Sequence, residues 1–194
     1  MSAPTVMDAP ALPGPRRALA QELTAAAVGP VPCNWLERTG RRDQVLTAWG
    51  RGQLAEVPVG LCFDVLLVPG GLARDVIDRV CAVGIRPGPV ILGPSGAEII
   101  IALDSASGWC APASVLLRRG ALVLLPPPTV RVPETVAARG WLIPPAHRSA
   151  SAPPEAGLMS GGDLVRPYRA AVRAAEEAAC LADPGRSRAG GMDR

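Results

Sequence analysis

Hydrophobic and polar positions follow two different periods in the central part of the chain. Residues 63–68 (FDVLLV) are almost all apolar over the length of one strand, which predicts a central strand covered on both faces. After the turn at 69–71 (PGG), apolar residues recur at helical spacing from Leu72 to Val83, and Gly84 ends this predicted helix. A buried strand followed by an amphipathic helix indicates a sheet that is covered by helices.

Shorter apolar segments surround this unit. A glycine turn at 93–96 (GPSG) separates two strand-like runs and predicts a hairpin. The other predicted elements are helices at 15–28, 43–49 and 114–119, and strands at 31–35, 89–92, 97–103, 121–125 and 141–143. Together these elements predict a single α+β (α/β) domain of about 130 residues at 15–146.

The two ends of the chain have a different pattern. The sequence predicts a disordered leader at 1–14, an Ala/Ser/Pro/Gly-rich linker at 147–162 and a disordered tail at 183–194. Between linker and tail, residues 163–182 predict an Ala-rich C-terminal helix. Tyr168, Val172, Ala175 and Ala179 form a thin apolar stripe on this helix, so the helix either packs on the domain or binds a partner.

Composition narrows the class of protein. The chain has 194 residues, of which 48% are hydrophobic, and this predicts a folded core that needs no disulfide or structural metal. All 20 basic residues are arginine, but the net charge is only +3, so most arginines are expected to be solvated surface residues. No apolar run approaches the ~20 residues that span a bilayer, which predicts a soluble protein without a membrane partner.

The cysteines and the histidine give little sign of a metal site. Five cysteines at irregular spacing and one histidine, His147, cannot complete a Cys/His zinc cluster, and His147 is expected to be solvated. Cys62 and Cys81 lie among apolar residues and are expected to be buried thiols. Reduced thiols are typical of the cytoplasm, which is the expected localisation.

Cys110 is the candidate for nucleophilic chemistry. The segment 63–71 (FDVLLVPGG) resembles the DJ-1/amidotransferase superfamily, in which a strand ending in P-G-G precedes a nucleophilic cysteine on a strained elbow. Such a thiolate needs a lowered pKa and an oriented base, whereas Cys110 does not follow a buried strand. The turn at 68–71 could present free N–H groups to an anion, but it matches no phosphate-binding motif and is expected to be a tight turn.

Acidic residues offer a second kind of chemistry, because two-metal phosphoryl transfer needs carboxylates that converge on ions ~4 Å apart. Asp75 and Asp78 lie on the predicted helix beside arginines, where ion pairing is expected. No D-x-D or D-x-E pair falls on a predicted strand. Asp64, inside the apolar strand, and Asp104 are the remaining candidates for catalytic acids.

The order of segments between residues 45 and 145 resembles one family. The matching pieces are 57–69 (VPVGLCFDVLLVP), 72–90 (LARDVIDRVCAVGIRPGPV), 94–103 (PSGAEIIIAL), 122–129 (LVLLPPPT) and 140–145 (GWLIPP). In this order they are similar to the N-terminal domain of bifunctional DNA primase/polymerases, the prim-pol branch of the archaeo-eukaryotic primase superfamily, and in particular to its small actinobacterial members. The resemblance implies a primase-like domain with an RRM-like mixed sheet flanked by helices.

The same resemblance implies a two-metal site for primer synthesis. In that family the site has a paired acid on the first strand, a histidine on the hairpin strand and a third acid before a later strand. Carried onto this sequence, the paired acids fall near Leu67 and Pro69, the histidine near 98–99 and the third acid near 114–115. Leucine and proline cannot bind Mg²⁺, whose ligands are hard oxygens. The expectation is therefore a primase-like scaffold without catalytic residues, metal or cofactor.

Four functions stay open for this chain. The first is a nucleic-acid-binding, nucleotide-binding or regulatory protein, in which Arg118, Arg119 and Arg131 contact phosphate. The second is an active primase/polymerase that uses Asp64 and Asp104 with Mg²⁺ or Mn²⁺. The third is an interaction module that binds a protein partner or a second copy through residues 163–182. The fourth is a DJ-1-like enzyme that uses Cys110.

Overall fold

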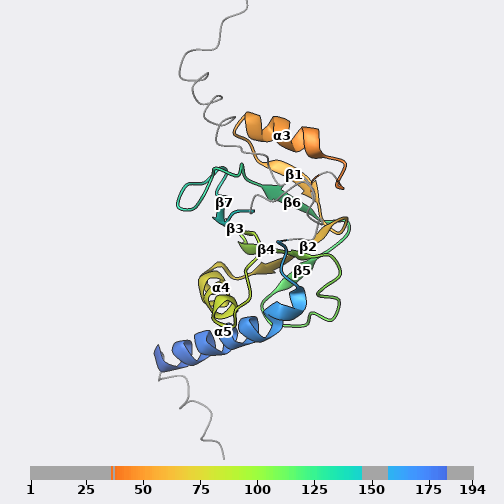
Figure 1. The fold of residues 1–194 in the computed structure, drawn as a ribbon. Coiled ribbons are helices and arrows are strands. Elements are labelled where there is room, and N and C mark those ends of the chain that lie inside the picture. The colour runs from red at the N-terminus through yellow and green to blue at the C-terminus, as the bar shows by residue number, and fades with distance from the viewer. Residues whose placement is uncertain (1–35, 37, 146–156, 183–194) are drawn as a thin grey trace, which may run out of the picture.

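The computed structural model describes residues 36, 38–145 and 157–182. The fold is α+β, with a five-stranded sheet between two layers (Figure 1). The leader, the helix at 15–28, the strand at 31–35, most of the linker and the tail that the sequence predicts lie outside the described residues.

The five-stranded sheet has the order β5-β2-β4-β3-β7. Its strands are β2 (Phe63–Val68), β3 (Val90–Gly93), β4 (Gly96–Ala102), β5 (Val115–Leu117) and β7 (Gly140–Ile143). The bounds of β2 are those predicted from its apolar run, and the predicted hairpin is formed by β3 and β4, which meet at the Gly93–Gly96 pair.

Helix α4 (Ala73–Ala82) connects β2 to β3, and β4 lies between these two strands. This is a split β-α-β arrangement, and β5-β2-β4-β3 is the strand order of an RRM-like sheet. The sheet is not mixed, however, because every pair of neighbouring strands is antiparallel. The antiparallel pairing gives the α+β form of the predicted fold class.

The helix predicted at 114–119 is also wrong, because these residues contain the edge strand β5. Leu117 pairs with Val65 and Val115 pairs with Leu67. The three consecutive apolar residues of β5 gain a hydrogen-bonded partner on β2, and this pairing decides their conformation where local periodicity gives no signal.

One face of the sheet is covered by α3 (Arg42–Gly50) and a two-stranded sheet made of β1 (Ala55–Pro58) and β6 (Leu122–Leu125) (Figure 1). The predicted helix at 43–49 and strand at 121–125 correspond to α3 and β6, whereas β1 was not predicted. Within this layer, Trp49 Nε1 on α3 donates to the Leu125 carbonyl of β6 at 3.1 Å. Trp141 Nε1 on β7 donates to the Pro126 carbonyl at 3.0 Å and joins this layer to the five-stranded sheet.

The opposite face is covered by α4 and α5 (Gly161–Ala182), which confirms the predicted C-terminal helix. Leu164 and Tyr168 in its first half are fully buried against this face. The end of the predicted linker also packs there, because Met159 is buried and its carbonyl accepts the Ala102 N–H at 2.9 Å.

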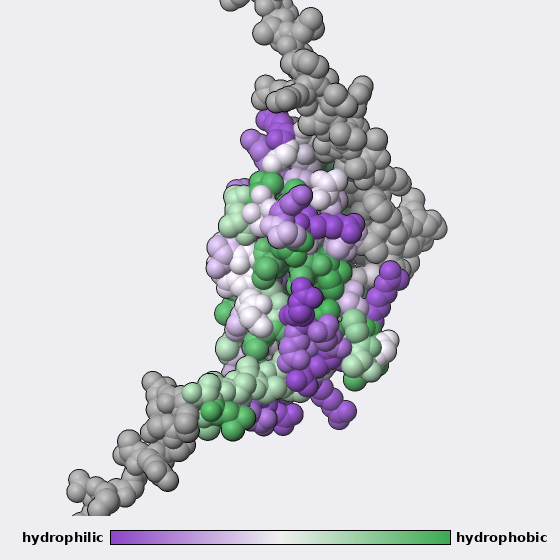
Figure 2. Space-filling view, turned by 90° about the vertical axis from the view of Figure 1, so that its left-hand side faces the viewer, coloured by the Kyte–Doolittle hydropathy of each residue, from purple (hydrophilic) through white to green (hydrophobic). Residues whose placement is uncertain are grey.

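The second half of α5 extends past the domain. Ala175 and Ala179, predicted on the packed stripe, are exposed, and Leu181 is 83% exposed. Figure 2 shows this apolar end of α5 as a green surface beside the grey trace at the lower left. Part of the predicted stripe is therefore in the core and part of it is uncovered.

Four cysteines in the described part of the chain are free thiols. Cys62 is buried as predicted, and burial raises its pKa to about 11. Cys81 is exposed, which corrects the prediction, because it lies outside the buried stripe that Val76 and Val80 form on α4. None of the helices within the described residues is long and apolar enough to cross a membrane.

Candidate functional site

Three of the positions that the primase resemblance assigns to its metal site lie side by side on neighbouring strands, whereas Pro69 follows the end of β2. Leu67 on β2 pairs with Glu98 on β4 and, on its other side, with Val115 on β5. Residues directly opposite each other in antiparallel strands point to the same face of the sheet. One carboxylate, one leucine and one valine therefore form a row where the family would gather its metal ligands.

Glu98 is the acidic member of this row, and it is engaged by an arginine. Its side chain is 8% exposed, and its Oε1 atom accepts a hydrogen bond from Arg139 Nη1 at 2.6 Å. Its Oε2 atom is buried without a hydrogen-bond partner. The Arg139 guanidinium lies over Gly93, where a Cβ atom would come within 3.2 Å of it.

This donor set does not fit the two metal ions that the resemblance implies. Mg²⁺ and Mn²⁺ take oxygen ligands, and two ions need several carboxylates. The row offers one carboxylate that already pairs with a cation. In the described part of the chain, no three His, Cys, Asp or Glu side chains come together as a metal site would require.

The face of the sheet on which this row lies is also filled by core residues. Phe63, Val65, Ile100 and Trp141 are each at most 1% exposed, and they pack against the layer of α3, β1 and β6. An RRM binds nucleic acid by stacking bases on aromatic residues of its open sheet face. The corresponding surface here is the interior of the protein.

Asp64 and Asp104, the alternative catalytic acids, are brought together by the fold. Asp64 is 1% exposed, and its Oδ2 atom accepts the Asp104 backbone N–H at 2.9 Å. Burial raises the pKa of Asp64, the Asp104 carboxylate raises it further, and the Asp104 N–H and Arg118 oppose this shift. Asp104 has a positive φ of 56°, so the buried carboxyl holds the turn that follows β4.

Cys110 lies in the loop between β4 and β5 and is exposed. Its Sγ atom is 3.6 Å from Arg169 Nη2 on α5. The residue is not on an elbow between a strand and a helix, and His147 lies outside the described residues. The PGG segment after β2 forms a tight turn into α4, in which the Leu72 N–H donates to the Pro69 carbonyl at 3.0 Å.

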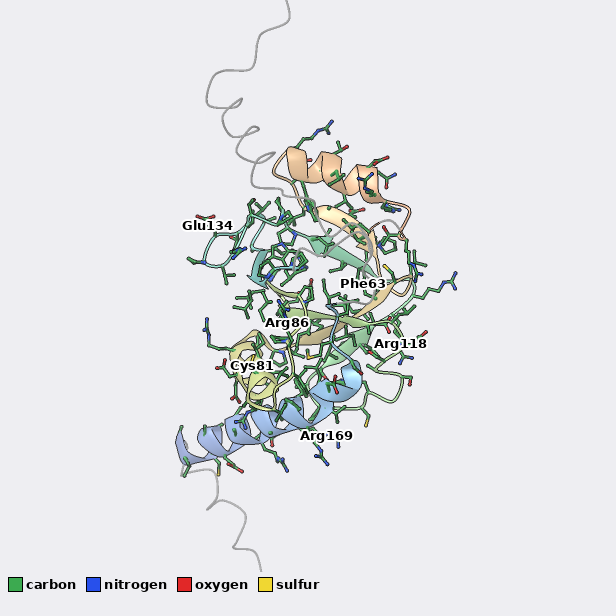
Figure 3. All side chains as sticks on the ribbon, in the orientation of Figure 1. Phe63, Cys81, Arg86, Arg118, Glu134 and Arg169 are labelled. Atoms are coloured by element: carbon green, nitrogen blue, oxygen red, sulfur yellow. The ribbon has the colours of Figure 1, made fainter. Side chains whose placement is uncertain are left out.

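The three arginines proposed from the sequence are all exposed, but they do not gather. Arg118 and Arg119 follow the edge strand β5, whereas Arg131 lies in the loop before β7, which is the opposite edge of the sheet. Figure 3 shows Arg118 on the right of the molecule and Glu134, from the same loop as Arg131, at the upper left. Arg118 also donates to the Ala106 carbonyl at 3.2 Å.

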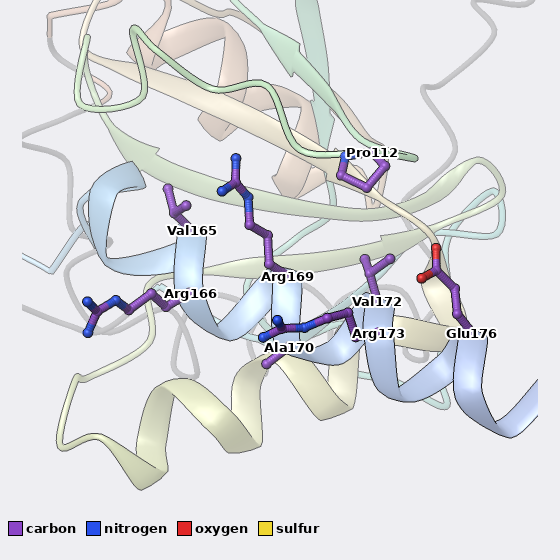
Figure 4. A pocket seen from close by; sticks show the side chains of 8 residues that line it. All are labelled: Pro112, Val165, Arg166, Arg169, Ala170, Val172, Arg173 and Glu176. Carbon is purple, nitrogen blue, oxygen red and sulfur yellow. The ribbon is translucent and has the colours of Figure 1, made fainter.

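A different set of arginines does gather, on α5. Arg166, Arg169 and Arg173 are exposed and follow one another at spacings of three and four residues, so they share one face of the helix. They surround a hollow of about 680 Å³ that Val165, Val172 and Pro112 also line (Figure 4). We call these three residues the α5 arginines.

None of the ion pairs found among the described residues involves the α5 arginines. These residues were not predicted from the sequence, because the predicted phosphate-binding arginines were Arg118, Arg119 and Arg131. The signal was present as R-x-x-R-x-x-x-R within a predicted helix. Three guanidinium groups on one face can contact successive phosphate or carboxylate groups.

Comparison with known proteins identifies no relative, because no family model, no curated protein and no solved structure matches the chain.

Proposed function

We propose that this protein is a non-catalytic, cytoplasmic nucleic-acid-binding protein on a primase-like scaffold. The observation that carries the proposal is that the α5 arginines are exposed and have no carboxylate partner among the described residues. Arginine contacts phosphate through paired, charge-assisted hydrogen bonds, and such contacts supply most of the affinity of nonspecific nucleic-acid binding.

The sheet supports a binding role without nucleotidyl transfer. The row of Leu67, Glu98 and Val115 provides one carboxylate, which Arg139 engages. Phosphoryl transfer depends almost entirely on metal ions and charges positioned around the phosphate. With the sheet face filled by core residues, the exposed surface of α5 is the place where nucleic acid would be contacted.

Fluorescence anisotropy with a labelled DNA or RNA strand tests this function. Three phosphate contacts on a single strand give a slope of about −2 for log K against log salt, so affinity should fall about twentyfold between 50 and 200 mM salt. A primer-extension assay with Mg²⁺ or Mn²⁺ should incorporate no nucleotide. Absence of binding at 50 mM salt, or incorporation of even one nucleotide, would contradict the proposal.

A further inference from the structure

The hollow beside the α5 arginines combines charge with apolar surface. Val165 and Val172 on α5 and Pro112 on the facing loop line it, while Arg166, Arg169 and Arg173 stand around it (Figure 4). Pro112 is exposed and Val165 is partly exposed, whereas Val172 is buried at 7% exposure. The ligand therefore needs negative charges and an uncharged face close to each other.

A single strand of nucleic acid meets this requirement better than a duplex does. In a duplex the bases are stacked inside and the phosphates form the outer surface, so the apolar lining would contact no partner. In a single strand the base faces are free and can pack on apolar or guanidinium surfaces beside their own phosphates. The combination of Pro112 and Val165 with the arginines therefore favours a single strand.

The α5 arginines also extend over a defined length of the helix. Arg166 and Arg173 are separated by roughly 10 Å along the helix axis at a rise of about 1.5 Å per residue. The three guanidinium groups are spread over this length, so each can contact a separate phosphate and together they can contact about three. Glu176, which also lines the hollow, follows Arg173 on the same side of α5 and repels the next phosphate.

On the basis of the proposed function, we infer that the hollow between α5 and Pro112 binds a single-stranded nucleic-acid segment of about three nucleotides. The Glu176 carboxylate limits this segment at one end, because it repels the next phosphate. Exposed Cys110, whose Sγ atom lies 3.6 Å from Arg169 Nη2, stands at the edge of this segment and reports on it.

Binding of matched single strands and duplexes tests the inference. The single strand should bind at least tenfold more tightly than the duplex of the same sequence, and strands of about 4, 8 and 16 nucleotides should show the same salt slope. Glu176→Gln should strengthen binding about twofold, because one exposed repulsive charge is removed. Glu134→Gln, an exposed residue in the loop before β7, is the control and should change nothing.

Alkylation followed by mass spectrometry gives a second readout. A saturating strand should slow iodoacetamide labelling of Cys110 at least fivefold, while the exposed Cys81 on α4 should label at an unchanged rate.

The outcomes separate the inference from the proposed function. If no strand and no duplex binds, the proposed function itself fails. If nucleic acid binds but the duplex binds as tightly, or Cys110 stays unprotected, the function stands and the single-stranded site is wrong. Binding of poly-glutamate as tight as that of the strand would overturn the inference and indicate an acidic polypeptide as the ligand.

Discussion

Leu67 on β2 stands directly opposite Glu98 on β4, and both belong to the row that the primase resemblance would fill with metal ligands. An alkyl group and a carboxylate in these places cannot hold two divalent ions, because the alkyl group has no donor atom. The carboxylate is used instead to bind Arg139 from the segment before β7. At this position in the sheet, Leu67 provides an alkyl side chain and Glu98 forms a buried ion pair with Arg139.

Breaking this ion pair should destabilise the protein strongly. Arg139→Met leaves the buried Glu98 carboxylate without a partner, so the free energy of unfolding should fall by about 3 kcal/mol or more in urea denaturation. Arg131→Met, at an exposed arginine in the same connection, should cost less than about 0.5 kcal/mol.

The double variant Glu98→Leu/Arg139→Met provides the decisive comparison. Removing both charges leaves no unpaired charge, so the double variant should be more stable than Arg139→Met alone. A double variant that is less stable than either single variant would show that the pair is not coupled as the geometry indicates.

The two halves of α5 should respond differently to the same substitution. Leu164→Ala removes a fully buried side chain and should lower the free energy of unfolding by about 2–5 kcal/mol. Leu181→Ala, at a residue that is 83% exposed, should change it by less than about 0.5 kcal/mol. Thermal and urea unfolding measure the free energy of unfolding of both variants. Equal losses in the two variants would contradict the division of the helix into packed and uncovered parts.

The thiols should react in an order set by burial. Because the pKa of Cys62 is raised to about 11, almost none of this residue is thiolate at pH 8. Iodoacetamide at pH 8 should therefore label exposed Cys81, Cys110 and Cys180 well before Cys62 in the folded protein. Labelling of all four at similar rates, with the fold intact by circular dichroism, would be the contrary result.

Asp64 should make stability depend on pH. Burial raises its pKa in the folded state, so the folded protein holds this proton more tightly than the unfolded chain does. The resulting stabilisation is present below the unfolded pKa of about 3.9 and is lost as the pH rises through the folded value.

Asp64→Asn isolates this effect, because the amide oxygen can still accept the Asp104 N–H and cannot ionise. The stability of Asp64→Asn relative to the native protein should increase as the pH rises from about 4 and then level off. A constant difference across this range would show that Asp64 does not titrate with a raised pKa.

The sequence predicts elements best where one local pattern decides the conformation. The continuous apolar run of β2 and the glycine turn of the β3–β4 hairpin need no information from elsewhere, and both are found as predicted. The strand β5 was predicted as a helix because its three residues become a strand only by pairing with β2. β1 was missed for a similar reason, since its partner β6 lies far along the chain.

The candidate site was harder to predict than the fold. Arg118 and Arg119 are adjacent in sequence, but Arg131 lies at the other edge of the sheet, and only the strand order reveals this. The α5 arginines share one face because α5 is a helix, and the hollow beside them exists because the Pro112 loop lies opposite. The first fact could be predicted from spacing, whereas the second requires the tertiary structure.

Binding of a labelled single strand to two variants of equal charge tests the central claim most directly. Arg166→Gln/Arg169→Gln/Arg173→Gln removes the α5 arginines, and Arg51→Gln/Arg74→Gln/Arg86→Gln removes three exposed arginines from elsewhere. At 50 mM salt the first variant should bind at least tenfold more weakly and lose most of its salt dependence, while the second should bind within about twofold of the native protein. Equal losses in the two variants, with both folded, would contradict a phosphate-binding site on α5.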